Sequence, residues 1–134
     1  MRAFFWLWVM ILILCLVTDS AAYWVARGRL SASLELALDA ALIGSIDESD
    51  LTRGRQLARS DNARVWANEI SRKNLSGLLA RNAAFSFELN QDMDRIWVSG
   101  QVRSEIPFLL GSLAGKGGRE ISVSKSLCYQ GGYK

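Results

Sequence analysis

The chain has no histidine, only one proline and two cysteines among its 134 residues. Without histidine it cannot form a Ser-His-Asp triad, a Cys-His pair or a histidine metal site. Two cysteines are too few for a zinc knuckle or a disulfide framework. Cys15 lies inside an apolar run, which argues against a bridge to Cys128. We therefore expect no metal centre of these kinds and no catalytic residue among them.

Charge of either sign is also sparse. The chain has 16 Lys and Arg residues against 13 Asp and Glu residues, which gives a net charge of +3 at pH 7. The basic residues are scattered, whereas nucleic-acid binding favours a basic stripe or patch. Half of the residues are hydrophobic, more than a disordered chain carries. We therefore expect a folded protein that binds no nucleic acid.

Two segments look like ligand-binding loops but lack the residues that such loops need. Gly115 to Gly118 contains a lysine between glycines, but a phosphate-binding P-loop has a longer spacing and opens a helix. Asp92 and Asp94 lack the glycine and the distal glutamate of a calcium-binding EF-hand loop. We expect no enzyme activity, no cofactor and no small-molecule substrate.

What the chain does have is a long uncharged run near its start. Ala3 to Val17 contains no charge, although a helix needs about 20 residues to cross a bilayer core. Aromatic residues favour the membrane interface, and the aromatic residues at 6–8 and 23–24 stand about 25 Å apart along a helix. We therefore predict a transmembrane signal-anchor segment over residues 1–24, with Asp19 near its outer boundary.

A cleaved signal peptide is the alternative interpretation of this segment, because Ser20-Ala21-Ala22 is a possible small-residue cleavage site. In either case the chain enters the export pathway. A short flank with Arg2 favours an amino terminus in the cytoplasm, with everything after Tyr23 outside. We predict a single-pass protein of the cytoplasmic membrane that contacts membrane lipid, with residues 25–134 as an extracytoplasmic α+β domain.

The helix is predicted to continue well beyond the membrane. Its apolar residues recur at the spacing of one helix face, namely Leu30, Leu34, Ala37 or Leu38, and Ala41. No proline interrupts residues 3–43, and Gly44 is the expected residue just after the helix end. The result is a helix of about 60 Å with a transmembrane half and an amphipathic half.

The rest of the chain predicts one or two short helices followed by a small three-stranded antiparallel sheet, an α+β fold. Ser49 or Asp50 can cap a helix that ends near Arg59, and Ser60-Asp61 can cap another over residues 63–81. Three runs then alternate apolar and polar side chains, as antiparallel strands do, over residues 84–89, 95–103 and 119–129. A short helical turn is expected over residues 107–111.

The alternation assigns the apolar side chains of the strands to one face of the sheet. This face contains Phe85, Phe87, Leu89, Ile96, Val98, Val102, Ile121 and Val123. We expect it to pack on the amphipathic half of the long helix and on Trp66 and Ile70, because so small a sheet needs a partner in water. Trp97 falls on the opposite face, either as an exposed contact for a neighbouring subunit or beneath the 107–111 segment.

Two stretches of the long helix and one near the C-terminus carry a further pattern. Asp19 to Leu30 reads Asp-Ser-Ala-Ala-Tyr-Trp-Val-Ala-Arg-Gly-Arg-Leu, and Leu34 to Gly44 reads Leu-Glu-Leu-Ala-Leu-Asp-Ala-Ala-Leu-Ile-Gly. Later, Ile-Pro-Phe-Leu-Leu-Gly at 106–111 precedes a loop and the strand at 121–124. Together these stretches resemble the TadE/TadG-like pseudopilins of bacterial tight-adherence (Tad/Flp) pilus systems. Glu35 stands where that family usually has glutamine. A prepilin-peptidase site is lacking, so the TadG-like members fit better.

The resemblance implies a minor pseudopilin that helps to assemble, prime or tip a Tad-type pilus or secretion filament. Its expected partners are other pilin-like subunits or Tad platform proteins. The candidate assembly residues are Asp19, Tyr23, Glu35, Asp39 and Trp97. Of these, Asp39 is expected to pair with an arginine from residues 53–81 rather than to lie solvated. The alternative function is a secreted or membrane-tethered small binding domain unrelated to pili.

Overall fold

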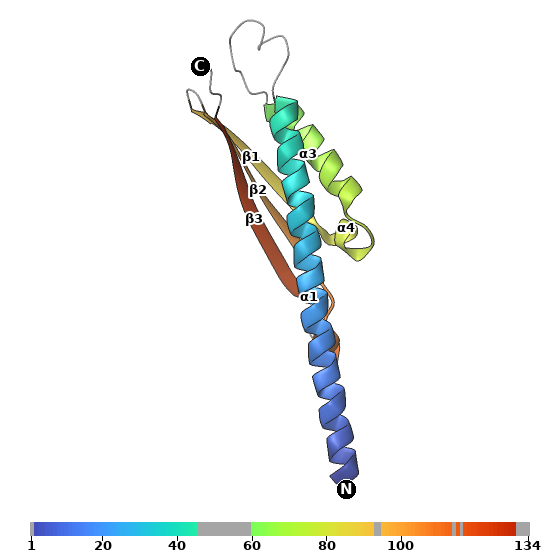
Figure 1. Cartoon of the computed structure of the whole chain (residues 1–134). Helices are drawn as coiled ribbons and strands as arrows, with labels where there is room; N and C mark the ends of the chain where they lie inside the picture. The colour runs from blue at the N-terminus through green and yellow to red at the C-terminus, as the bar shows by residue number, and fades with distance from the viewer. Residues whose placement is uncertain (1, 46–59, 93–94, 114, 116, 131–134) are drawn as a thin grey trace, which may run out of the picture.

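The computed structural model of the chain describes residues 2–45, 60–92, 95–113, 115 and 117–130. In these residues helices α1 (Arg2–Ser45), α3 (Ser60–Asn74) and α4 (Leu78–Asn82) precede strands β1 (Ala84–Asp92) and β2 (Arg95–Ile106). Helix α5 (Leu109–Leu113) and strand β3 (Arg119–Gln130) complete the order. Figure 1 shows the sheet and α3 beside the upper part of α1. The α+β fold predicted from the sequence is confirmed.

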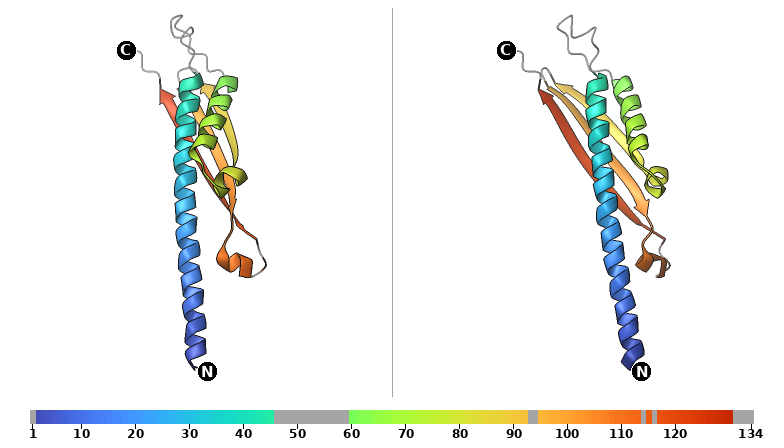
Figure 2. Two further views of the ribbon diagram at one scale, coloured as in Figure 1. Left: turned by 90° about the vertical axis from the view of Figure 1, so that its right-hand side faces the viewer. Right: turned by 45° about the vertical axis from the view of Figure 1, so that its right-hand side comes forward.

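Helix α1 organises the whole molecule. It has 44 residues and is therefore about 66 Å long. Its N-terminal part projects beyond the sheet and the other helices in all views (Figures 1 and 2). From Ala26 onward one face is buried, and the predicted core residues Leu30, Leu34, Ala37, Leu38 and Ala41 all lie on it.

The sheet has the order β1-β2-β3, and both strand pairs are antiparallel. Phe85 lies opposite Val102, which lies opposite Val123, and Val98 lies between Leu89 and Leu127. The apolar side chains predicted to share a face do so, because these partners are directly opposite in register. This inner face packs on α1, and a Cβ added at Gly100 would lie 2.9 Å from Leu34 Cδ1.

Helix α3 packs on α1 through small residues, and this corrects the expected place of Trp66. The buried residues of α3 include Ala63, Ala67 and Ser71, which recur every four residues and so share one face. The Ser33 hydroxyl of α1 donates a hydrogen bond of 3.1 Å to the Ser71 carbonyl oxygen. Because this face is small, the two helices approach closely and the bulky Trp66 stays at the flank, 53% exposed.

The end of α1 also differs from the prediction. Gly44 lies inside the helix, which continues through Ser45, instead of following its last residue. A Cβ at Gly44 would lie 2.8 Å from Cδ1 of Trp66. Glycine at this position therefore makes room for Trp66, and α1 does not end there.

The predicted helix over residues 63–81 is two helices. The chain leaves α3 at Asn74 and enters α4 at Leu78, and between them Gly77 has φ of 64°. That left-handed conformation favours glycine and cannot continue a helix. The helix expected to end near Arg59, with Ser49 or Asp50 as its cap, lies outside the described residues.

Candidate functional site at the junction of stem and head

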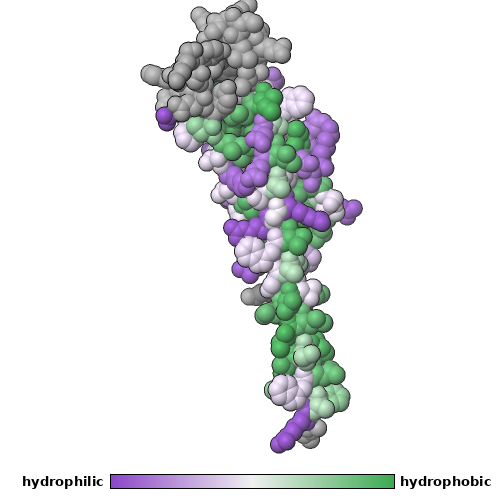
Figure 3. All heavy atoms as spheres, in the orientation of Figure 1, coloured by the Kyte–Doolittle hydropathy of each residue, from purple (hydrophilic) through white to green (hydrophobic). Residues whose placement is uncertain are grey.

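The N-terminal part of α1 extends past the other elements, and we call residues 2–18 the stem and the remaining described residues the head. Large apolar side chains more than half exposed cover the stem: Phe4, Phe5, Trp6, Leu7, Trp8, Met10, Ile13, Leu14, Leu16 and Val17. Figure 3 shows this part of the surface as mostly hydrophobic. The helix is long and apolar enough to cross a membrane, and the head buries almost none of its most apolar stretch. An exposed apolar surface of this extent is typical of a site that contacts a membrane or another protein.

Asp19 lies where the stem meets the head, and it is only 7% exposed. Its Oδ1 accepts a hydrogen bond of 2.8 Å from the amide of Leu109, and its Oδ2 accepts one of 3.0 Å from the amide of Leu110. These are the first amides of α5, and the first amides of a helix have no partner within it. A carboxylate there also interacts favourably with the positive end of the helix. Asp19 therefore holds the N-terminus of α5 against α1, at the point where the stem ends.

The structure gives Asp19 a role that sequence reasoning did not find. The sequence predicted its place near a membrane boundary but named no partner. The feature of the sequence that pointed to such a contact was the carboxylate itself, because an acidic residue next to a long apolar helical run needs hydrogen-bond donors from elsewhere in the chain. The short helix predicted after Pro107 was a source of such donors, since its first amides are free.

Tyr23 lies one helical turn beyond Asp19 and contacts the edge of the hydrophobic core. Arg119, the first residue of β3, places its guanidinium carbon 5.6 Å from the centre of the Tyr23 ring. The neighbouring Trp24 ring meets Tyr23 edge to face at 6.0 Å, and Arg27 lies 5.9 Å from the Trp24 ring. Aromatic and basic side chains therefore gather just beyond the stem, where sequence reasoning had named only the tyrosine as a candidate.

An open pocket of about 490 Å³ lies between α1 and the segments around α5 and the start of β3. Leu16, Phe108 and Leu110 give it apolar lining, and Asp19 and Arg119 also line it. Both oxygens of Asp19 already accept amide hydrogen bonds. Arg119 is thus the basic group of the pocket lining, beside a carboxylate that is held by amides.

Glu35 and Asp39 lie further along α1 and have different surroundings. Glu35 forms an ion pair with Lys125 of β3, which joins the helix to the sheet edge. Asp39 is exposed, and within the described ranges no arginine pairs with it. The expected pair is thus not found for Arg64, Arg72 or Arg81, because Leu38 and Ala41 occupy the buried side of α1. The arginines at 53–59 lie outside the described residues.

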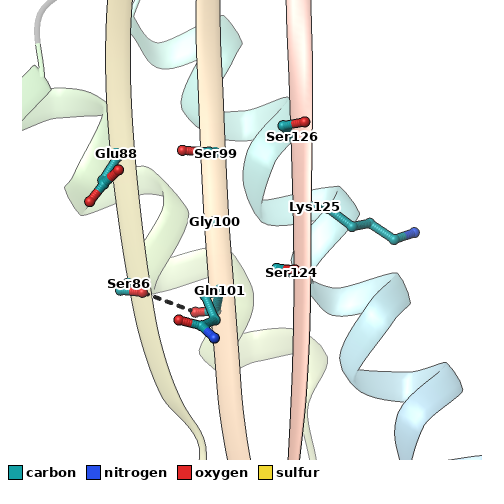
Figure 4. Close-up of a pocket in the computed structure, with 8 residues that line it drawn as sticks. All are labelled: Ser86, Glu88, Ser99, Gly100, Gln101, Ser124, Lys125 and Ser126. Carbon is teal, nitrogen blue, oxygen red and sulfur yellow. Dashed lines mark hydrogen bonds between the residues drawn. The ribbon is translucent and has the colours of Figure 1, made fainter.

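Trp97 is 42% exposed on the outer face of the sheet, opposite Asn90 and Cys128. The 107–111 segment does not cover it, because that segment follows the far end of β2. The same outer face has a shallow, polar hollow lined by Ser86, Glu88, Ser99, Gly100, Gln101, Ser124, Lys125 and Ser126 (Figure 4). In Figure 4 the Lys125 side chain points away from the others.

No group of three or more Cys, Asp and Glu side chains in the described ranges is arranged to hold a metal ion. The junction combines the hydrogen-bonded carboxylate of Asp19, the Tyr23 and Trp24 rings, and the guanidinium groups of Arg27 and Arg119. These groups can form non-covalent contacts. Comparison of the chain with family models, with curated proteins and with solved structures finds no match.

Proposed function

We propose that this protein is a membrane-anchored, non-enzymatic assembly subunit of the pseudopilin type, similar to the TadE/TadG-like proteins. One observation carries the proposal: a single helix is an exposed apolar stem in its first part and the packed spine of an α+β head in its second. A subunit of this shape packs its stem against other stems inside the membrane. Its head is then free to make lateral contacts outside.

The junction supports a stem that spans the cytoplasmic membrane. The uncharged run ends at Val17, which is short for a bilayer core that needs about 20 helical residues. Because α5 covers Asp19 and donates one hydrogen bond to each of its oxygens, the cost of placing the carboxylate at this depth is reduced. The span then extends to about Ala22, with Arg2 on the cytoplasmic side and the head outside.

The proposed partners are other pilin-like subunits or Tad platform proteins. Trp97 supports a contact by the head, because it is a large exposed aromatic residue on a mostly polar sheet face. Tryptophan is enriched among the residues that dominate binding at protein interfaces. Glu35 contributes indirectly, since its ion pair with Lys125 helps to align the spine with β3.

Stem packing is tested by placing a single cysteine at each of positions 13, 14, 15 and 16 in a full-length chain that lacks Cys128. These four positions cover all sides of one helical turn. In membranes of cells whose partner subunits carry single cysteines at the same depth of their own stems, oxidation of the two thiols is expected to yield disulfide-linked adducts from the face that packs. A variant without any cysteine is the control. Absence of an adduct at all four positions contradicts the proposal.

The secreted binding domain makes the opposite prediction for the N-terminus. A mature protein in the medium that begins at Tyr23, shown by intact mass, supports that alternative. A membrane-extracted protein that retains Cys15 supports the anchored subunit.

A further inference from the structure

We infer that the pocket at the junction binds a phospholipid from the outer leaflet of the membrane, with Arg119 holding its phosphate. This inference rests on the proposed membrane anchoring of the stem. It adds a specific lipid site to an anchor that otherwise needs only a hydrocarbon environment.

The position of the pocket along α1 fits the junction of acyl chains and headgroups. Its lining on α1 runs from Leu16 in the stem to Tyr23 and Trp24, a rise of about 12 Å. Leu16 is 58% exposed and belongs to the surface that faces hydrocarbon. Tyr and Trp side chains favour the interfacial layer. The pocket lining therefore changes from apolar near Leu16 to amphipathic near Tyr23 and Trp24, in the order in which a membrane changes from hydrocarbon to headgroups.

The apolar lining fits the beginning of an acyl chain. Phe108 and Leu110 line the pocket opposite the stem, and Leu109 beside them is 50% exposed. The Asp19 hydrogen bonds hold this segment against α1. Leu16 belongs both to the exposed stem and to the pocket lining, so an acyl chain that lies along the stem meets the pocket at Leu16.

The charge of the pocket fits a phosphate. Arg119 lines it and lies against the Tyr23 ring, and no carboxylate pairs with it in the described part of the chain. A guanidinium presents planar donors that match phosphate oxygens. Asp19 is the acid that lines the pocket, but its oxygens already accept two amide hydrogen bonds. Arg119 is exposed and forms no ion pair with Asp19 in the described structure, so its guanidinium can interact with an anion from the membrane.

The test uses the full-length protein in detergent, with dioleoylphosphatidylglycerol added as the probe and bound lipid counted by native mass spectrometry. The wild type is expected to retain one lipid. Arg119→Gln is expected to bind it roughly 10-fold to 100-fold more weakly, the effect of losing a hydrogen bond to a charged group. Arg119→Lys keeps the charge and is expected to recover part of the binding.

Arg103→Gln is the matched control, because Arg103 is also exposed but lies on β2 and does not line this pocket. It is expected to retain lipid as the wild type does. Equal retention by Arg119→Gln and wild type overturns the inference. So does competition by millimolar inorganic phosphate as effective as that by lipid, or a change of oligomeric state in Arg119→Gln with unchanged lipid binding.

A flotation assay with vesicles of the same lipid separates this inference from the proposed function. If the wild type floats but Arg119→Gln retains lipid normally, the anchor stands and the lipid site does not exist. If the wild type does not float with vesicles, the anchor and the lipid site are both contradicted.

Discussion

At the scale of single residues, Asp19 connects the two parts of the molecule. A buried carboxylate at the end of an apolar helical stretch is costly unless donors surround it. Here the donors are two backbone amides from a segment 90 residues later in the chain. The stem could be predicted from composition alone, but this contact could not, because it depends on how the chain returns to α1 after β2.

Replacing Asp19 tests how much this contact contributes. Asp19→Asn keeps the shape but faces one amide with an NH₂ group, so a partly buried donor loses its acceptor. We expect the free energy of unfolding to fall by about 1–3 kcal/mol, measured by denaturant unfolding of the full chain in micelles. Asp39→Asn makes the same chemical change at an exposed site and is expected to stay within about 0.5 kcal/mol. Equal effects of the two variants contradict the role of Asp19.

Two buried serines, Ser104 and Ser33, are expected to change the free energy of unfolding in opposite directions when each is replaced by alanine. The Ser104 hydroxyl is buried and has no hydrogen-bond partner in the described structure, whereas the Ser33 hydroxyl bonds the Ser71 carbonyl. Ser104→Ala removes an unsatisfied polar group and is expected to raise the free energy of unfolding by about 1 kcal/mol. Ser33→Ala is expected to lower it by about 1 kcal/mol. Thermal melts of the two variants that shift in the same direction argue against this account.

At the scale of elements, periodicity predicted most of the fold because burial follows it closely. The helical spacing of Leu30, Leu34 and Ala41 gave the buried face of α1, and the alternation in residues 84–129 gave the inner face of the sheet. Trp66 was placed wrongly, because hydrophobicity predicts burial without showing how closely two helices approach. The Asp39 pairing failed in the described residues for a similar reason: a charge in a helix pattern does not reveal which neighbour faces it.

The contact of α1 with the middle strand gives the element-scale prediction. Gly100 faces Leu34 and Leu38, whose terminal methyls would lie 2.9 Å and 3.0 Å from an added Cβ. Gly100→Val therefore overpacks the core and is expected to lower the free energy of unfolding by about 1–3 kcal/mol. Gly117→Val is the control, because nothing lies within 4 Å of its Cβ position, and it is expected to be near neutral. An unchanged free energy of unfolding in Gly100→Val would contradict the close packing of Gly100 against Leu34 and Leu38.

At the scale of the whole molecule, one continuous helix joins an exposed apolar stem to a packed head, and α5 and the start of β3 lie at the point of change. The division into an exposed apolar stem and a packed head could be predicted from the sequence, because it follows from the distribution of charge along the helix. The pocket at the junction could not, since its walls come from α1, α5 and β3, which only the fold brings together.

The two native cysteines test the placement of stem and head directly. Cys15 lies in the stem, and Cys128 is exposed on the head. In intact bacterial spheroplasts that express full-length single-cysteine variants, a membrane-impermeant maleimide is expected to label Cys128 in the Cys15→Ser variant. It is expected to leave Cys15 unlabelled in the Cys128→Ser variant until detergent is added. Labelling of Cys15 in intact spheroplasts, or protection of Cys128, would contradict a stem within the membrane and a head outside it.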